Sequence, residues 1–380
     1  MKSPMIKKND REQIAECSQI TCGDSSCCGG SVNKKVKYEK NPAWKNGKVE
    51  TSVGPVSVIS TKLSKKDILG AWKVRWGFGR MNYRIKPGLY AVGNPTDNSP
   101  ALVTANYKLT FDRLRQELSG LDAWILVLDT KGINVWCAAG KGTFGTEEII
   151  RRIHLVNLDR IVKHRNIILP QLGAPGVAAH EVGKSTGFKV TYGPVRASDL
   201  PAFLKAGMQQ QSGMRRVKFT FRDRLALVGV DLVRPSIIMA AVFALMLLFR
   251  AAGIHVIPLR EVFFFGGAVL SGAVLAPLIL PWLPGRSFAF KGWQLGILWV
   301  ALIYIYYFWI VGSPFSWEQM IAYLLTLPAL SAFLTLNFTG STTFTSFSGV
   351  VKEMMIAIPV IVVSFGAGSL VWVAMAFIKV

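Results

Sequence analysis

Short apolar runs alternate with stretches of helical periodicity between Pro87 and Gly207. The periodicity predicts helices at 110–118, 146–163, 177–184 and 198–206. Thr110 is placed to cap the first of these, and Phe111, Leu114 and Leu118 share one of its faces. The apolar runs predict strands at 89–92, 101–105, 123–128, 167–169 and 188–192. Strands separated by helices of this length predict βαβ units, and therefore a Rossmann-like α/β domain.

Five longer hydrophobic stretches follow this region. They lie at about 225–249, 262–281, 294–312, 319–337 and 354–378. Each is long enough for a helix that crosses a hydrocarbon core about 30 Å thick. The mean hydropathy of +0.35 is high for a water-soluble protein and agrees with membrane insertion. The sequence therefore predicts an all-α transmembrane domain of five helices.

The chain divides into four predicted parts. Residues 1–50 form a polar, Lys-rich tail, 51–207 the α/β domain, 208–224 a basic linker and 225–380 the transmembrane domain. Of the 44 Lys and Arg residues, 37 lie in residues 1–224, together with 18 of the 22 acids. This positive charge, and a chain start without an apolar signal segment, predict that the N-terminal domain is cytoplasmic. We expect a multi-pass protein of the cell (inner) membrane.

The excess of basic residues raises the question of nucleic acid. The basic residues do not form a stripe interleaved with aromatic residues, and zinc-finger spacing is missing from the sequence. Nucleic acid is therefore not an expected partner. The basic linker is better explained as a flank that holds the first hydrophobic stretch at the cytoplasmic surface.

Cys137 is the one cysteine in the sequence beyond residue 28. It lies in the segment 134–142, Asn-Val-Trp-Cys-Ala-Ala-Gly-Lys-Gly, which follows the apolar run 123–128. Open α/β sheets bind ligands at the carboxyl ends of their strands. A lone cysteine is more often a small buried hydrophobe than a ligand. Asn134, Trp136 and the small residues 138–140, which would leave room for a flat macrocycle, favour a ligand.

Two other patterns compete for the chemistry of the chain. Residues 140–145 read G-x-G-x-x-G, but the pattern does not follow its strand directly and lacks a suitably placed acid, so dinucleotide binding is disfavoured. Four cysteines of the tail have a spacing that fits neither zinc nor iron–sulfur motifs. They are either a capture site for a thiophilic ion such as Hg(II), or reduced residues without a role. These cysteines are Cys17, Cys22, Cys27 and Cys28.

Four motifs carry a resemblance to a known family. Their residues are Asn-Val-Trp-Cys-Ala-Ala-Gly-Lys at 134–141, Gly-Leu-Tyr-Ala-Val-Gly-Asn-Pro at 88–95, Thr-Ala-Asn-Tyr-Lys at 104–108 and Leu-Pro-Gln-Leu-Gly-Ala-Pro-Gly at 169–176. In this order they resemble the HgcA family, the membrane-bound corrinoid proteins of microbial mercury methylation. The corrinoid domain of that family is similar to the corrinoid iron–sulfur protein. The resemblance runs from about residue 63 through the membrane region.

The resemblance implies a cofactor and a site. The cofactor would be a cobalamin-type corrinoid, with Cys137 as the catalytic residue and the lower axial ligand of cobalt. A thiolate ligand donates electron density to the metal, which favours release of a methyl group with its electrons to an electrophile such as Hg(II). The implied cofactor-binding residues, besides Cys137, are Thr104, Ala105, Asn106, Asn134, Val135, Trp136, Ala138, Ala139, Gly140, Lys141, Gly142, Gly173 and Ala174.

The resemblance also implies an activity and partners. The activity would be that of a corrinoid-dependent methyltransferase that converts an Hg(II)–thiolate substrate to methylmercury. The partners would be a ferredoxin-like electron donor with two 4Fe–4S clusters, and a methyl-donor protein or the methyl-folate pathway. One alternative is a membrane-anchored corrinoid methyl carrier of one-carbon metabolism with a different acceptor. Another is a transporter with a sensing domain, which the few charges within the hydrophobic stretches disfavour.

Overall fold

The computed structural model describes residues 38–39, 42–251, 258–313, 315–342, 344 and 347–378. The four tail cysteines lie outside these residues. The α/β region contains helices α2 (Lys65–Arg75), α3 (Lys108–Glu117), α4 (Val135–Gly140), α5 (Thr146–Val156), α6 (Leu158–Ile161), α7 (Ala179–Thr186) and α8 (Leu200–Lys205), and the 3-10 helix η2 (Gln171–Gly176). Its strands are β1 (Lys45–Thr51), β2 (Gly54–Ile59), β3 (Gly88–Val92), β4 (Ala101–Ala105), β5 (Ala123–Leu128), β6 (Asn166–Leu169) and β7 (Lys189–Tyr192).

Within the described residues the strands form one mixed sheet in the order β1-β2-β3-β5-β4-β6-β7. Strands β5, β4, β6 and β7 are parallel to one another, as the predicted βαβ units require. β3 runs antiparallel to β5, because only the short loop 93–100 joins β3 to β4. A parallel crossover needs a longer connection, so this edge of the sheet departs from an all-parallel arrangement.

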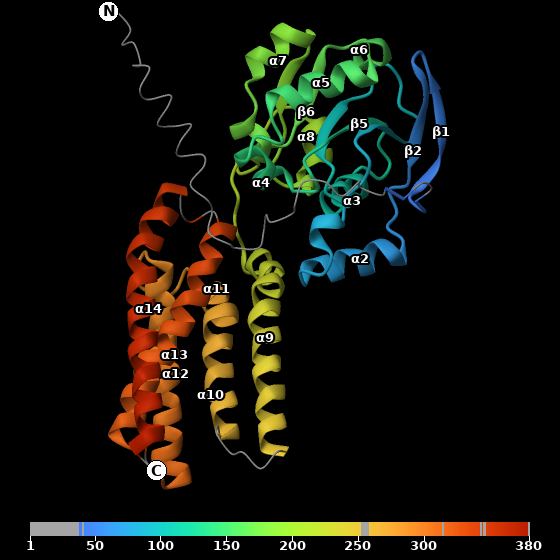
Figure 1. Ribbon diagram of the computed structural model, residues 1–380. Helices are drawn as coiled ribbons and strands as arrows, with labels where there is room; N and C mark the ends of the chain where they lie inside the picture. The colour runs from blue at the N-terminus through green and yellow to red at the C-terminus, as the bar shows by residue number, and fades with distance from the viewer. Residues whose placement is uncertain are drawn as a thin grey trace, which may run out of the picture. The chain divides into compact units, whose positions relative to one another are not determined.

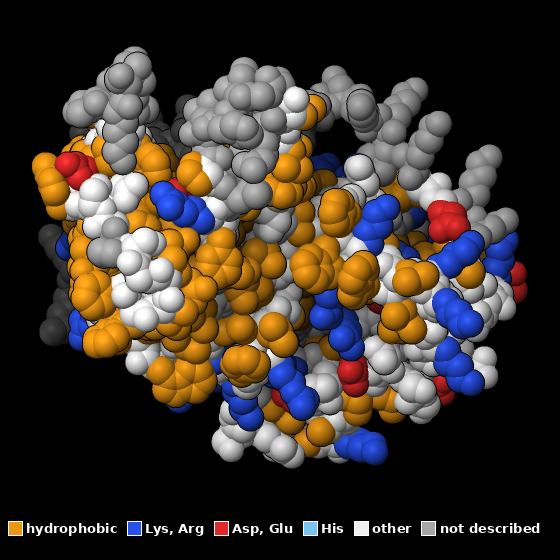
Figure 2. All heavy atoms as spheres, turned by 90° about the horizontal axis from the view of Figure 1, so that it is seen from below, with side chains coloured by type: hydrophobic (Ala, Val, Ile, Leu, Met, Phe, Trp, Pro, Cys, Tyr) orange, Lys and Arg blue, Asp and Glu red, His pale blue; other side chains and the backbone are white. Residues whose placement is uncertain are grey.

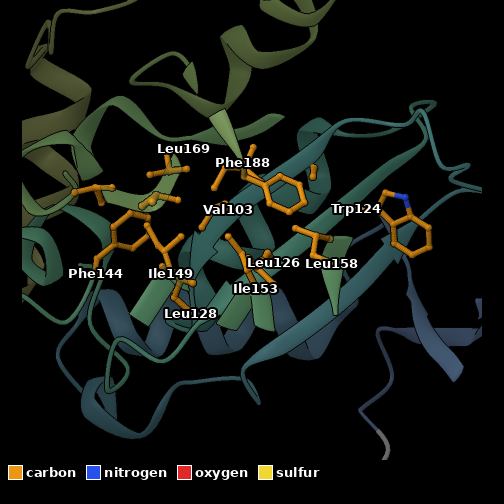
Figure 3. Close-up of a cluster of buried hydrophobic side chains, with 14 of the residues drawn as sticks. Val103, Trp124, Leu126, Leu128, Phe144, Ile149, Ile153, Leu158, Leu169 and Phe188 are labelled. Atoms are coloured by element: carbon orange, nitrogen blue, oxygen red, sulfur yellow. The ribbon is translucent and has the colours of Figure 1, made fainter. Parts of the chain in front are cut away.

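Helices cover both faces of the sheet, and successive residues of β5 point to opposite sides. Leu126 and Leu128 pack with residues of α4, α5 and α7, whereas Ile125 and Val127 pack with residues of α3 and α8. Figure 3 shows the first of these clusters, with Phe144, Ile149 and Ile153 directed at the sheet. Because every residue of β4 and β5 is buried, their sequences read as continuous apolar runs.

Several predicted boundaries were wrong. α3 begins at Lys108, and its N-cap is Tyr107 without a side-chain bond, so Thr110 lies inside the helix and does not cap it. The single predicted helix 146–163 is interrupted at Asn157, whose left-handed backbone (φ 46°) separates α5 from α6. β1 begins at Lys45, within the predicted tail; its polar, mostly exposed edge-strand sequence hides it from a search for apolar runs.

The second half of the described chain is helical. It contains α9 (Phe221–Ala251), α10 (Leu259–Leu270), α11 (Ala276–Ile279), α12 (Phe288–Tyr306), α13 (Trp317–Asn337) and α14 (Phe347–Ile378). Helices long and apolar enough to cross a membrane cover Phe221–Leu245, Arg260–Ile279, Phe288–Val311, Trp317–Asn337 and Ser348–Met375. The prediction of five membrane-length helices is thus confirmed for the described residues, and Figure 1 shows them as long, roughly parallel ribbons.

Glycines set the helix spacing in this region. A Cβ on Gly296 of α12 would lie 2.4 Å from the Cα of Pro328 in α13, and one on Gly272 would lie 2.4 Å from the Ser331 carbonyl oxygen. The backbones can approach this closely only because both positions lack a side chain. α13 is consequently the most enclosed of the membrane-length helices.

Candidate functional site at the carboxyl edge of the sheet

The parallel strands bring three of the predicted segments to one edge of the sheet. β4, β5 and β6 point in the same direction, so the residues after Ala105, Leu128 and Leu169 lie at the same edge. From β4 the chain passes to its neighbour β5 on one side and later to β6 on the other. In α/β proteins, ligands bind beyond the carboxyl ends of the strands at a reversal of this kind.

Asn106 fastens the loop that follows β5. Its side-chain oxygen accepts hydrogen bonds from the backbone N–H groups of Thr130 (3.2 Å) and Gly132 (2.9 Å), and its amide donates to Asp129 (3.1 Å). Asn106 is fully buried. The amide therefore fixes the path of the chain into α4, and its contacts are with protein.

Asn134 fixes the first turn of α4. Its side-chain oxygen accepts a hydrogen bond from the backbone N–H of Cys137 at 2.9 Å, which makes it the N-cap of the helix. Thr130 supports the same segment, since its hydroxyl donates to the Ile133 carbonyl oxygen at 2.7 Å. The position of Cys137 is thus determined by a chain of polar contacts that begins at the end of β4.

The predicted residues of α4 divide between its two sides. Val135, Ala138 and Ala139 are buried in the hydrophobic core, so packing alone explains the two small alanines. Trp136 and Cys137 are partly exposed, whereas Gly140, Lys141 and Gly142 are exposed. Cys137 is therefore accessible at the carboxyl edge, with its side chain in the turn that Asn134 caps.

The segment η2 lies directly against α4. A Cβ on Gly176 would meet the Phe144 carbonyl oxygen at 2.4 Å and the Ala139 Cα at 3.0 Å. One on Gly173 would meet the Phe144 ring at 2.5 Å, while Ala174 is partly exposed. The structure thus places η2, which contains Gly173 and Ala174, beside α4, and the small size of Gly173 accommodates the Phe144 ring.

Thr104 and Ala105 are both buried within β4, one strand away from the loop that leads to α4. Only Asn106, the last of this predicted group, reaches beyond the strand to contact the loop. The motif at 88–95, which also carries the resemblance, does not end at the same edge of the sheet as the other three motifs. Because β3 is antiparallel, its carboxyl end lies at the opposite edge of the sheet, where the backbone N–H of Asn94 bonds to Asp122.

Sequence reasoning did not assign Tyr107 or Arg80 to the site. Tyr107 is buried; burial raises the pKa of its phenol, nearby Arg80 and Arg75 oppose the shift, and negative charge on Cys137 adds to it. Tyr107 therefore lies within electrostatic reach of the thiol. Tyr107 lies inside the motif 104–108, and that was its signal in the sequence. Arg80 lies outside the four motifs and had no such signal.

Other polar features lie elsewhere. The Lys108 side chain belongs to a buried ion-pair cluster with Asp67 and Asp112. A hollow of about 310 Å³, lined mainly by β2, the start of β3 and the end of α5, contains none of the predicted site residues. Among the described residues, clusters of three or more His, Cys, Asp or Glu side chains that could hold a metal are lacking. Cys137 could thus contribute one bond to a metal whose other ligands come from elsewhere.

The fold and the site define a class: a mixed α/β domain with a partly exposed thiol at the carboxyl edge of its sheet, joined to helices of membrane length. Residues 78–204 match a protein family described as CO dehydrogenase/acetyl-CoA synthase delta subunit. The matched region contains β3 to β7 and every predicted site residue.

Individual proteins match the same domain. A gamma subunit of the acetyl-CoA decarbonylase/synthase complex from Methanopyrus kandleri is 33% identical over 136 residues, which are 35% of this chain and 28% of the relative. The large subunit of the corrinoid/iron-sulfur protein from Moorella thermoacetica is 34% identical over 127 residues, 33% of this chain and 28% of the relative. The chain thus spans little more than a quarter of the length of these relatives.

Proposed function

We propose that this protein is a membrane-anchored, corrinoid-dependent methyltransferase that transfers a methyl group to Hg(II) and releases methylmercury. Its α/β domain would be a Rossmann-like corrinoid-binding domain. The observation that carries the proposal is the partly exposed thiol of Cys137, capped in α4 within a domain that is similar to the large subunit of a corrinoid/iron-sulfur protein.

The donor set fits this cofactor. A metal held by protein alone needs three or four side-chain ligands. A cobalt atom inside a macrocycle brings its own nitrogen ligands and would need only one ligand from the protein. Cys137 provides one sulfur donor at the ligand-binding edge of the sheet. When bound, the corrinoid would supply the cobalt atom that carries the methyl group.

The residues of the chain would hold and orient the donor. The hydrogen bond from the Cys137 N–H to Asn134 fixes the helical turn that carries the sulfur, and Asn106 fixes the loop before it. Trp136, partly exposed beside Cys137, would cover one side of the cofactor. As a thiolate, Cys137 would donate electron density to the bound metal, which is what transfer of a methyl group to an electrophile such as Hg(II) requires.

The balance of electrons implies partners. A methyl group that leaves with its electron pair must be replaced from a donor that supplies it without one, so each cycle requires electrons from outside. We propose a ferredoxin-like donor with 4Fe–4S clusters for the electrons, and a methyl-donor protein or the methyl-folate pathway for the methyl group. The hydrophobic helices would keep the domain at the cytoplasmic side of the inner membrane.

The test is the visible spectrum of the full-length protein, loaded with corrinoid under anaerobic conditions. We expect Cys137→Ala to change the cobalt absorption bands, and Cys137→His to give a nitrogen-ligated spectrum with slower transfer to Hg(II). The control replaces Cys17, Cys22, Cys27 and Cys28 by Ser and keeps Cys137; its spectrum should equal that of the wild type. If the wild-type and Cys137→Ala spectra coincide, Cys137 is not a ligand of cobalt.

A second candidate is a corrinoid methyl carrier of one-carbon metabolism with a different acceptor. The names of the relatives favour it, since they are subunits of an acetyl-CoA decarbonylase/synthase complex. Both candidates predict the same spectrum. Purified protein supplied with the ferredoxin, a methyl donor and Hg(II) separates them, because only the methyltransferase proper yields methylmercury without a further protein.

A further inference from the structure

The helix α2 has an unusual distribution of side chains. Its outer side exposes three large apolar residues, Ile68 (57%), Leu69 (66%) and Trp72 (63%). Its acidic residue, Asp67, is buried and paired with Lys108 and Arg115 of α3. In a water-soluble domain the large apolar residues of a helix pack inward, whereas these three residues of α2 face outward.

Basic residues frame the apolar side. Lys65, Lys66 and Lys73 are all exposed on α2, while the one acid of the helix is turned inward. The outer surface of α2 therefore carries positive charge only. Figure 2 shows apolar side chains interleaved with Lys and Arg over the α/β domain in the view from below.

This surface lies next to the first membrane-length helix. A Cβ on Gly229 of α9 would be 2.9 Å from the Arg75 carbonyl oxygen at the end of α2, and 3.5 Å from the Trp76 ring. Trp76 in turn contacts Trp72, with ring centroids 5.9 Å apart. Gly229 lies about two turns inside the helix that begins at Phe221. α2 is thus held at the level where α9 would enter the bilayer.

We propose that α2 is an interfacial helix that inserts Ile68, Leu69 and Trp72 into the headgroup region of an anionic lipid bilayer. Helices that lie on membranes combine Trp, Leu and Ile on one side with Lys residues beside them, and anionic lipids attract those lysines. The ion pairs of Asp67 with α3 transmit this attachment to the α/β domain. The bilayer thereby orients the domain beyond what the linker alone would do.

The test is photo-crosslinking of the full-length protein in vesicles of phosphatidylcholine and phosphatidylglycerol. Benzoylphenylalanine replaces Leu69 in one variant, the equally exposed Leu155 of α5 in the negative control and Ile238 of α9 in the positive control. We expect lipid adducts at positions 69 and 238, with a yield at 69 several-fold above that at 155. Adducts at 238 but not at 69, or adducts at 69 to protein instead of lipid, would overturn the proposal. If neither position labels lipid, the membrane location fails and the proposal fails with it.

A second arm tests the charge. Lys65→Glu, Lys66→Glu and Lys73→Glu, combined in one protein, should lower the yield at position 69 several-fold in the anionic vesicles. The same variant should change little in vesicles of phosphatidylcholine alone. An equal yield from wild type and triple variant in both kinds of vesicle would contradict the role of anionic lipid.

Discussion

The side-chain oxygen of Asn134 lies 2.9 Å from the backbone nitrogen of Cys137 and accepts its hydrogen bond. α4 is only six residues long, too short to be stable without its cap and its packing. Cys137, which is partly exposed, is therefore positioned by the Asn134 amide before the helix and by the buried Ala138 and Ala139 on its inner side.

Asn134→Ala should loosen the first turn of α4. Loss of an N-cap costs about 1 kcal/mol, so exchange of the Cys137 amide hydrogen should accelerate about fivefold. Hydrogen-exchange mass spectrometry of the peptide that contains α4 measures this. Asn134→Ser keeps a capping oxygen and should exchange nearly like the wild type; equal acceleration in both variants would show that the cap is not the cause.

Asn106→Ala should destabilise the whole α/β domain. It leaves the buried N–H groups of Thr130 and Gly132 without their acceptor, at a cost of about 2–5 kcal/mol in the free energy of unfolding. Urea unfolding in detergent measures the change. The control is Asn98→Ala in an exposed turn, which should stay within about 0.5 kcal/mol of the wild type. Similar losses in the two variants would refute the assigned role of Asn106.

The ion-pair cluster of Asp67, Lys108, Asp112 and Arg115 should make the free energy of unfolding depend on pH in the acid range. Burial alone would raise the pKa of Asp67, but hydrogen bonds from Lys108 and from Ser64 outweigh it and lower the pKa from 3.8 to about 2. Because the folded pKa lies below the unfolded one, this stabilisation is complete above about pH 4 and is lost as the pH falls through 2. It amounts to roughly 2 kcal/mol.

Urea unfolding of wild type and Asp67→Asn between pH 2 and pH 5 measures that contribution. Asp67→Asn should lower the free energy of unfolding at neutral pH by about 3 kcal/mol, because Arg115 keeps a buried charge with one partner fewer. The variant should also show a flatter dependence on pH over this range. Asp97→Asn, which removes an exposed ion pair with Lys163, is the control and should keep the wild-type slope.

Gly176→Ala should push η2 away from α4. Its Cβ would lie 2.4 Å from the Phe144 carbonyl oxygen, and backbone cannot yield as a side-chain tip does, so we expect a loss of about 1–3 kcal/mol. Gly140→Ala, in the same site, meets nothing within 4 Å and should be neutral or slightly stabilising. Thermal unfolding and corrinoid binding measure both variants. Equal behaviour of the two alanines would contradict the close approach of η2 and α4.

Some elements could be predicted from the sequence because their signal is local. β4 and β5 are buried on both faces, and that burial forces an unbroken apolar run onto each of them. The membrane-length helices need a long apolar stretch, which no other element of this chain contains among the described residues. Cys137 was conspicuous because the surrounding motif is distinctive, not because its position was known.

The polar edge strand β1 and the interruption of the helix at Asn157 left no comparable signal. β1 depends on pairing with β2 rather than on its own apolar content, and Asn157 interrupts the helix through its backbone angle alone. Ala138 and Ala139 are a different case. The sequence favours them as space for a macrocycle, and the structure shows that both also pack in the core on the inner side of α4.

Local patterns in the sequence predicted β3 to β7, the helices long enough for a membrane, and the position of Cys137 after a strand. They did not predict β1 or β2. Long-range contacts set the rest: β3 runs antiparallel to β5, Asn106 fixes the loop before Cys137, and α2 turns Asp67 inward. The reason is physical. Periodicity records whether a residue is buried, whereas the direction of a strand, the partner of a hydrogen bond and the side of a helix that faces the core depend on groups far away in the chain.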